Sequence, residues 1–355
     1  MKTLKDYSLT DKRVLVRCDF NVPMAKKGNI LDDFRIKKTL PTIKYLIEER
    51  AKIVLMSHLD PESTDIVDKK YNFDKVAERL SELLGFSITK TDNCIGPEIE
   101  SAANSLEDGG VLLLENLKFH KEETGNDSNF ARELSYLGDI YVNDAFGSCH
   151  RNYASVVGVP QLLLDHCAGF LLEKEIESLD KIMINPEKPM IAIIGGKKVE
   201  TKAKFINNIS KIADFVIISG LIAKEVTEYS SEHKQNIKFE NPEKIIMPIG
   251  KLGALDISDE SIKMFQEKIM QAKTILWNGP FGKFEDKKYS KGTLAIANAI
   301  IDSGAFSVIG GGETVEFLNK QGMIDKFSHV STGGGAMLSY LAGDKLPGLE
   351  ALKQV

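Results

Sequence analysis

The chain has 355 residues, of which 43% are hydrophobic and 27% charged, so it is long enough to fold into two globular domains. Its net charge of −5 argues against a nucleic-acid binder, and no apolar run is long enough to span a bilayer. The four cysteines are scattered without metal-ligand spacing, and the N-terminus lacks the apolar core of a signal peptide. We therefore expect a soluble, cytoplasmic protein with reduced thiols.

Short apolar runs alternate with longer amphipathic segments along the chain. The first set of expected strands covers 13–18, 52–56, 111–116 and 140–146, with helices expected over 36–50 and 73–85. The second set of expected strands covers 190–195, 214–220, 273–279 and 305–312. Because these strands are apolar throughout and alternate with helices, they predict an α/β fold with two doubly wound parallel-sheet lobes. A helical pattern that starts near 169 and ends in an Asn-Pro turn is expected to join the lobes.

Different residue types follow the strands of the two sets, at the edge where parallel sheets bind ligands. In the first set these residues are polar, and they include Asp19-Phe20-Asn21 and Ser57-His58. In the second set they are glycine clusters at 195–196 and 310–312, with a further cluster at 333–335. Glycine lets backbone amides approach a phosphate, and a helix N-terminus adds partial positive charge. The second lobe is therefore expected to bind a nucleotide or phosphate, although neither a P-loop nor GxGxxG is present.

Basic side chains lie near the strand ends of the first lobe. They are Arg35, Lys118 and Arg151, with His58 close by. The planar fork of arginine suits carboxylates and phosphates alike, so Arg35 and Arg151 are candidates to hold a small anionic substrate. A basic residue of this kind, taken singly, is more often a solvated or ion-paired surface charge than a ligand contact, and His58 is equally compatible with a structural histidine.

The order of motifs resembles the phosphoglycerate kinase family over nearly the whole chain. The motifs that carry the resemblance include VRCDFNVP (16–23), DDFRI (32–36), VLLLENLKFH (111–120), YVNDAFGSCHR (141–151), IIGGKKV (193–199), WNGPFGKFE (277–285), GGGET (310–314) and STGGGA (331–336). The resemblance implies a hinge-closing, monomeric ATP:3-phosphoglycerate 1-phosphotransferase that uses Mg²⁺ with ATP or ADP. The substrate carboxylate is itself the nucleophile, so catalysis would come from positioning and charge neutralisation.

The resemblance also implies a lobe and a role for each motif residue. Residues 1–170 would bind 3-phosphoglycerate, 171–188 would form the linking helix, 189–340 would bind the nucleotide, and 341–355 would return to the first lobe. The implied catalytic residues are Arg35, Lys198 and Gly334. The implied substrate-binding residues are Asp19, Phe20, Asn21, Arg35, His58, Lys118 and Arg151. The implied nucleotide-binding residues are Gly196, Lys198, Lys202, Gly220, Asn278, Pro280, Glu285, Gly311, Gly312, Glu313 and Thr314, with Glu313 also near the metal.

Several binding positions depart from the family pattern. Pro61 stands where SHLGRP has arginine, Lys118 where ENLRFH has arginine, Glu313 where GGGDT has aspartate, and Ser258 where LDIGP has glycine. The region 226–256 is also shorter than usual. Because these changes weaken expected contacts, a weakly active or inactive paralogue that binds nucleotide or metabolite is an alternative. A dehydrogenase is a more distant alternative, since the dinucleotide fingerprint is missing.

Overall fold

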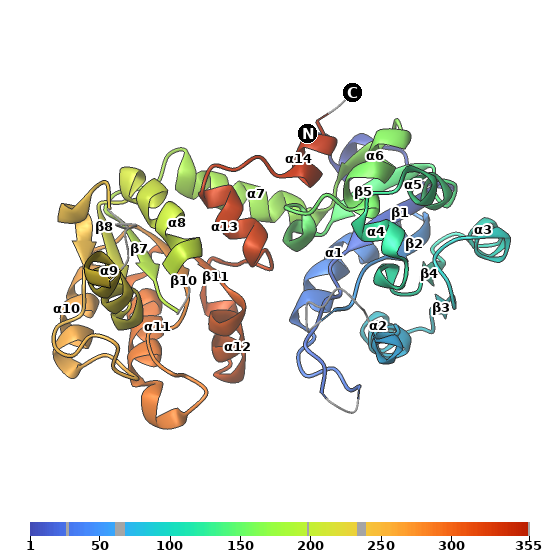
Figure 1. The fold of residues 1–355 in the computed structure, drawn as a ribbon. Coiled ribbons are helices and arrows are strands. Elements are labelled where there is room, and N and C mark those ends of the chain that lie inside the picture. Colours follow the sequence, from blue (N-terminus) through green and yellow to red (C-terminus); the bar gives the residue numbers. More distant parts are fainter. Residues whose placement is uncertain (26–27, 61–67, 197–198, 233–238, 354–355) are drawn as a thin grey trace. The chain divides into compact units, whose positions relative to one another are not determined.

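The computed structural model describes residues 1–25, 28–60, 68–196, 199–232 and 239–353, and these fall into two compact units. Unit 1 comprises Met1–Lys174 and Lys345–Val355, and unit 2 comprises Glu175–Asp344. Helix α7 (Phe170–Met183) begins in unit 1 and continues in unit 2 (Figure 1). No helix in the described part of the chain is both long and apolar enough to cross a membrane.

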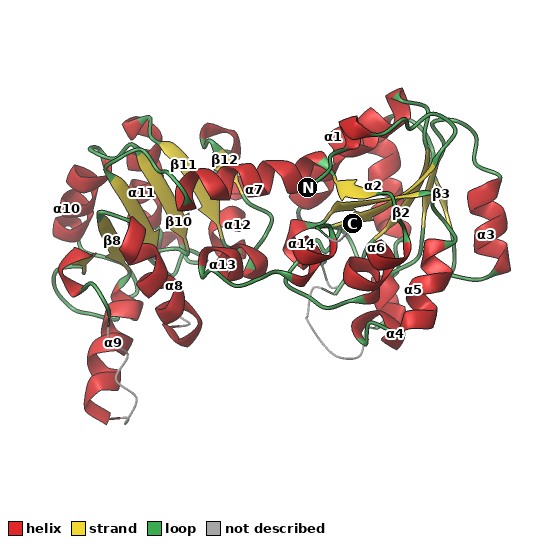
Figure 2. Cartoon of the chain, turned by 90° about the horizontal axis from the view of Figure 1, so that it is seen from above, coloured by secondary structure: helices red, strands yellow, loops and turns green. Residues whose placement is uncertain are grey.

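Unit 1 contains a six-stranded parallel sheet with strand order β3-β4-β2-β1-β5-β6 in its described residues. Its strands are β1 (Arg13–Cys18), β2 (Lys52–Met56), β3 (Thr89–Lys90), β4 (Val111–Leu113), β5 (Ile140–Asp144) and β6 (His166–Ala168). Its helices are α1 (Phe34–Glu48), α2 (Asp74–Leu84), α3 (Pro97–Asn104), α4 (Lys121–Thr124), α5 (Ser128–Ser135), α6 (Val159–Leu162) and α14 (Pro347–Ala351). Figure 2 shows helices on both faces of the sheet, as its continuously buried strands require.

Unit 2 repeats this plan with strand order β12-β11-β10-β7-β8-β9 in its described residues. Its strands are β7 (Met190–Ile194), β8 (Phe215–Ile218), β9 (Ile245–Ile246), β10 (Thr274–Asn278), β11 (Phe306–Gly310) and β12 (His329–Val330). Its further helices are α8 (Val199–Ile212), α9 (Gly220–Glu232), α10 (Asp259–Ile269), α11 (Lys291–Ser303), α12 (Gly312–Lys320) and α13 (Gly335–Leu341). The predicted fold class, two parallel α/β sheets in a two-lobed chain, is thus confirmed.

Local chemistry explains where individual elements begin and end. In unit 1, the side chain of Asp127 accepts the Asn129 and Phe130 amides and so caps the N-terminus of α5. Helix α2 ends at Gly85, which adopts the left-handed conformation with φ of 84°. In unit 2, Ser258 Oγ accepts the Ser261 amide and caps α10. Serine in place of the family's glycine at 258 therefore has a structural role.

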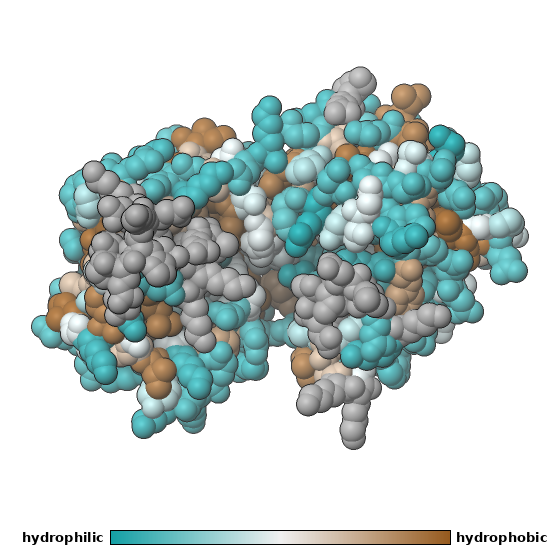
Figure 3. All heavy atoms as spheres, in the orientation of Figure 1, coloured by the Kyte–Doolittle hydropathy of each residue, from teal (hydrophilic) through white to brown (hydrophobic). Residues whose placement is uncertain are grey.

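The core of unit 1 forms where the inward faces of β1 and β2 meet α1 and α2. Val14, Val16, Ile53 and Leu55 are fully buried there, and Ile36 of α1 packs into the same cluster. On the face drawn in Figure 3 hydrophilic residues predominate, and the apolar patches are scattered. The core is therefore internal to each unit, and the strand ends carry the polar groups.

Candidate active site

The strand order places one potential ligand site in each unit. In unit 1, β1 pairs with β2 on one side and β5 on the other. The chain leaves β1 towards β2 and leaves β5 towards β6, so the connections run in opposite directions from this neighbouring pair. In unit 2, β7 likewise lies between β8 and β10. Ligands of open parallel sheets bind beyond the carboxyl ends of the strands at such a reversal. The residues after β1 and β5, and those after β7 and β10, are therefore the first candidates, and the residues after β2 lie next to those after β1.

Arg35 and Asp19 form an ion pair directly after β1. Arg35 Nη1 donates to both carboxylate oxygens of Asp19, at 3.0 and 2.8 Å. The Asp19 side chain is 1% exposed, whereas that of Arg35 is 30% exposed. Among the described residues Arg35 donates through Nη1 alone, so its other N–H groups can reach a ligand. The buried carboxylate thus fixes the guanidinium at the sheet edge.

Asn21, Asp60 and Lys118 form a second polar group beside the first. Asn21 Oδ1 accepts the Asp60 amide at 2.9 Å, and Lys118 Nζ lies 2.5 Å from Asp60 Oδ2. The side chains of Lys118 and Asp60 are 13% and 2% exposed. Lys118 is therefore already paired with an anion supplied by the chain itself. Pro61, the other departure at this edge, lies outside the described residues.

His58 follows β2 and is surrounded by cationic side chains. Arg17 Nη2 contacts His58 Nδ1 at 3.0 Å. Burial lowers the pKa of His58 well below its usual value, and the positive charges of Arg17, Lys118, Arg35 and Arg151 act in the same direction. Burial and the neighbouring cations thus both favour the neutral imidazole of His58.

The remaining substrate-binding candidates of unit 1 differ in exposure. Arg151 is exposed, and its amide donates to Ser148 O at 2.9 Å. The Phe20 side chain is fully buried in the core, and its amide donates to Ser57 Oγ at 2.9 Å. Arg151 can therefore meet a ligand directly, whereas Phe20 can offer no exposed side-chain surface to one.

In unit 2 the backbones after β7 and β10 lie in direct contact. A Cβ atom on Gly195 would lie 2.2 Å from Pro280 O, and one on Gly279 would lie 2.3 Å from Gly195 O. The Gly195 amide donates to Asn278 O at 2.8 Å, and the Gly196 amide to Pro280 O at 3.0 Å. Only glycine permits this approach, which explains the glycine pair after β7.

Lys202 projects from α8 beneath these glycine residues. Its side chain is 8% exposed, and its ammonium donates to Gly195 O. Burial lowers the pKa of Lys202 to about 8, and the negative charge of Glu313 opposes this shift. No carboxylate among the described residues forms an ion pair with this ammonium, and a buried ammonium in that state is suited to an anionic ligand.

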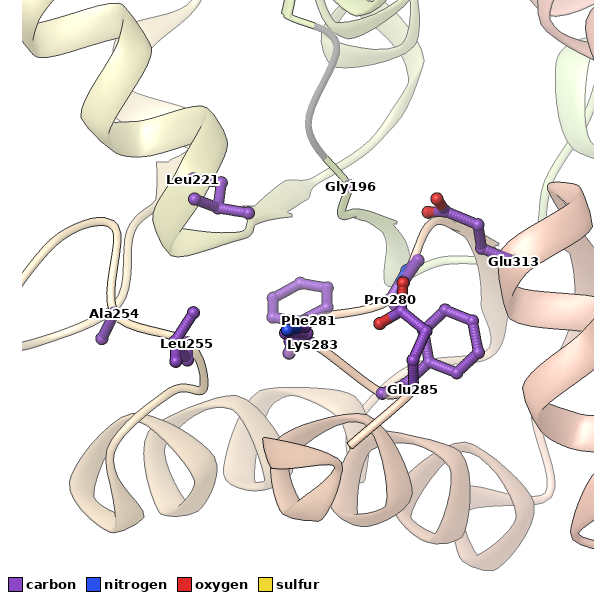
Figure 4. A pocket seen from close by; sticks show the side chains of 11 residues that line it. Gly196, Leu221, Ala254, Leu255, Pro280, Phe281, Lys283, Glu285 and Glu313 are labelled. Carbon is purple, nitrogen blue, oxygen red and sulfur yellow. The ribbon is translucent and has the colours of Figure 1, made fainter. Parts of the chain in front are cut away.

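A pocket opens beside this contact. Its lining residues are Gly196, Leu221, Ala254, Leu255, Pro280, Phe281, Gly282, Lys283, Phe284, Glu285 and Glu313. In Figure 4, Leu221, Ala254 and Leu255 lie at one end and Glu313 at the other, with Gly196 and Pro280 between them. The pocket therefore has an apolar end and a polar end, the combination found in small-molecule sites.

Of the predicted nucleotide-binding residues, Gly196, Pro280, Glu285 and Glu313 line this pocket. Asn278 is buried at the end of β10, and its Nδ2 has no hydrogen-bond partner among the described residues. Thr314 is buried and accepts the Gly279 amide. Gly220 begins α9, Gly311 is the N-cap of α12, and Gly312 is its first residue. Gly334 precedes α13 with φ of 49°. Lys198 lies outside the described residues.

Three buried residues of unit 1 were not predicted as functional. Arg17 donates through Nε to Ser155 Oγ at 2.8 Å, and Ser155 Oγ donates to Glu123 Oε1 at 2.5 Å. All three side chains are fully buried. The arginine inside an otherwise apolar strand was the one sequence signal, because a buried charge needs partners. Glu123 and Ser155 gave no signal, since nothing in their sequence positions indicates burial.

Comparison with known proteins identifies the family of the chain. A family model described as phosphoglycerate kinase matches residues 4–245 and 224–344. The phosphoglycerate kinase of Aquifex aeolicus (strain VF5) is 41% identical, with 98% of this chain and 96% of the relative covered. That of Borrelia hermsii (strain HS1 / DAH) is 40% identical over 394 positions and covers both chains fully. Since this chain has 355 residues, that alignment contains gaps in this chain.

Solved structures agree with this result. Phosphoglycerate kinase from Pyrococcus horikoshii OT3 gives a TM-score of 0.89 at 33% identity, with 99% of this chain and 98% of that chain covered. The enzyme from Coxiella burnetii gives 0.83 at 32% identity, with 99% of each chain covered. These comparisons support neither the binding-only paralogue nor the dehydrogenase. The chain belongs to the phosphoglycerate kinase family, which confirms the family and the kinase function predicted from its sequence.

Proposed function

We propose that the chain transfers a phosphoryl group reversibly between ATP and the carboxylate of 3-phosphoglycerate, giving 1,3-bisphosphoglycerate and ADP. The observation that carries this proposal is that both strand-order reversals bear anion-binding groups at the carboxyl ends of their strands. Unit 1 offers arginine side chains and unit 2 offers glycine amides with a buried lysine. Two anionic ligands of different kinds fit these two chemistries.

In unit 1 the substrate site comprises Asn21, Arg35, His58, Lys118 and Arg151. Arg35 is held at the sheet edge by Asp19 and keeps donors for the reacting carboxylate or the transferred group. Because a carboxylate is already a nucleophile, no general base is needed. Positioning and neutralisation of charge by the guanidinium then lower the barrier.

In unit 2 the apolar end of the pocket suits a nucleobase, and Glu285 suits the ribose hydroxyls. The phosphates then extend past Gly196 towards the ammonium of Lys202 and the amides of the first residues of α12. We assign Lys198 and Gly334 to the transferred phosphoryl group on the family pattern. Residues 171–188 act as the hinge between the substrate and nucleotide lobes, and the enzyme works as a cytoplasmic monomer.

The donor set of unit 2 fits Mg²⁺ bound together with a nucleotide. Within the described residues no group of three or more His, Cys, Asp or Glu side chains could hold a metal alone. Glu313 is exposed at the polar end of the pocket and supplies one carboxylate. Mg²⁺ is commonly held by one or two carboxylates, substrate phosphates and waters. When bound, it would neutralise phosphate charge during the transfer.

The test is a coupled assay of ATP-dependent turnover of 3-phosphoglycerate. Arg35→Ala should lower kcat by about a hundredfold or more, because it removes charge neutralisation in the transition state. Arg50→Ala is the matched control, since Arg50 is exposed and pairs with Asp108. No turnover in the native chain would refute the function. A normal kcat with a raised KM in Arg35→Ala would refute the role of Arg35.

A further inference from the structure

A buried chain of hydrogen bonds runs beneath the substrate site of unit 1. It begins at Glu123 on α4, which accepts the Ser155 amide at 2.9 Å and the Ser155 hydroxyl at 2.5 Å. Ser155 Oγ accepts from Arg17 Nε at 2.8 Å, and Arg17 Nη2 reaches His58 Nδ1 at 3.0 Å. Glu123, Ser155 and Arg17 are fully buried, so packing fixes the geometry of these hydrogen bonds.

The chemistry of the guanidinium fixes the direction of each hydrogen bond that Arg17 makes in this series. Arginine carries five N–H donors and no acceptor. His58 Nδ1 can therefore satisfy the contact with Arg17 only as an acceptor, with its lone pair directed at Nη2. A neutral imidazole whose Nδ1 is unprotonated carries its hydrogen on Nε2. Protonation of Nδ1 would place two N–H groups against each other.

The surrounding charges oppose protonation as well. Arg17 from β1, Arg35 from α1, Lys118 from the η3 turn (Leu117–Phe119) and Arg151 all act on His58 with positive charge. Burial contributes most to the lowered pKa of His58, and these cations add to it. Tyr153 packs edge-on against the imidazole, with ring centroids 6.5 Å apart. The described surroundings thus favour the neutral ring.

We propose that Arg17 is a positioning residue that holds His58 as the neutral Nε2–H tautomer, so that His58 offers one hydrogen-bond donor to the anionic substrate. The identity of that substrate rests on the proposed function, whereas the tautomer does not. Such a donor recognises an oxygen acceptor without adding charge to the substrate site, which already contains the cationic side chains of Arg35, Lys118 and Arg151. Substrate binding through His58 is then insensitive to pH near neutrality, unlike binding through an ordinary histidine.

The direct test is a nitrogen NMR spectrum of the full chain with ¹⁵N-labelled histidine. The chain has six histidines, and the His58 signals are assigned by their loss in His58→Gln. We expect a protonated Nε2 and an unprotonated Nδ1, with no titration between about pH 6 and 8. A protonated Nδ1, or a ring that titrates near pH 6.5, would overturn the proposal. This readout needs neither activity nor a variant of Arg17.

Substitutions test the functional consequence. Arg17→Met should raise the KM for 3-phosphoglycerate at least tenfold, leave the KM for ATP within twofold and let the neutral His58 ring populate the Nδ1–H tautomer as well. Arg17→Lys should restore part of the lost affinity, since an ammonium also donates to Nδ1. Arg13→Met is the matched control, because Arg13 lies at the other end of β1 and pairs with Asp139. It should leave both the tautomer and the KM unchanged.

The outcomes separate the two proposals. If the native chain shows no turnover but His58 has the Nε2–H form, the proposed function fails and the tautomer stands. If turnover is normal and Arg17→Met, shown to be folded by circular dichroism, keeps the native KM and a His58 ring that is entirely in the Nε2–H form, the positioning role of Arg17 is wrong. Should Arg17→Met fail to fold, the spectrum of the native chain and the partial effect of Arg17→Lys decide.

Discussion

Replacing Asp60 with asparagine should tighten the binding of 3-phosphoglycerate, because the native carboxylate already occupies the Lys118 ammonium. The two groups lie 2.5 Å apart, and their side chains are 2% and 13% exposed. The Asp60 amide also donates to Asn21, so the carboxylate lies within the proposed substrate site. Asparagine keeps the size of the side chain and an amide oxygen for Lys118 but removes the negative charge.

The expected magnitude follows from the burial of the pair. At 2.5 Å and an effective dielectric constant of about 20, the two charges attract by roughly 6–7 kcal/mol, most of which desolvation offsets. Breaking a buried pair by removing one partner costs about 3–5 kcal/mol, and the retained amide oxygen should reduce this loss to about 2–3 kcal/mol. A substrate phosphate that then pairs with Lys118 gains a charge-assisted hydrogen bond of about 1.5–3 kcal/mol. The dissociation constant should fall by about tenfold or more.

Titration calorimetry with 3-phosphoglycerate at low and physiological salt measures this change, and thermal unfolding with and without substrate measures the stability. We expect a lower Tm for free Asp60→Asn and a larger increase on adding substrate. Asp139→Asn is the matched control, since Asp139 pairs with Arg13 at the far end of β1. It should lose stability without a change in affinity. Equal or weaker binding by a folded Asp60→Asn would show that Asp60 orients Lys118 for the substrate instead of competing with it.

Three further predictions concern ionisable groups elsewhere. Burial lowers the pKa of Lys202 to about 8, so the ammonium loses its charge as the pH rises through 8. The affinity for ATP, measured by calorimetry, should therefore fall from pH 7 to pH 9, and Lys202→Met should remove this pH dependence. Glu313→Asp should raise kcat/KM with Mg²⁺, because the shorter carboxylate matches the family pattern, whereas lower activity would show a pocket built around glutamate. Burial raises the pKa of Asp144 from 3.8 to about 7, so between these two pH values the folded state binds more protons than the unfolded state. The free energy of unfolding should therefore fall as the pH rises from 3.8 to 7, by up to about 1.4 kcal/mol per pH unit. Urea unfolding of Asp144→Asn at pH 5 and 7 should show that slope flattened.

The interior strands could be predicted from the sequence, and the edge strands could not. The apolar runs 13–18 and 52–56 have the bounds of β1 and β2, because each run lies in the middle of a sheet and is buried along its length. The run 111–116 was predicted as strand throughout, but β4 ends at Leu113, where the chain turns towards the polar residues of the sheet edge. Strands β9 and β12 have two residues each, too few to produce a periodic pattern.

The site residues could be named from motifs, but their partners could not. Lys118 and Asp60 are 58 positions apart, and Arg17 and His58 are 41 apart, so neither pair leaves a local signal. The sequence suggested that Lys118 was a weakened substrate contact. The structure shows it paired with a buried carboxylate, a relation that depends on the adjacency of the residues that follow β2 and β4.

The discontinuity of unit 1 has a consequence for how the chain folds during synthesis. Its first part ends at Lys174, and its second part, Lys345–Val355, leaves the ribosome only after all of unit 2. The late segment donates the Gly348 amide to Cys149 O at 2.9 Å, and Ala351 packs against Val156 and Val157. Until then these valines lack their cover, so the nascent first unit exposes apolar surface while the second forms. Emergence of this late segment, and not completion of the first sheet, is therefore the step that closes unit 1.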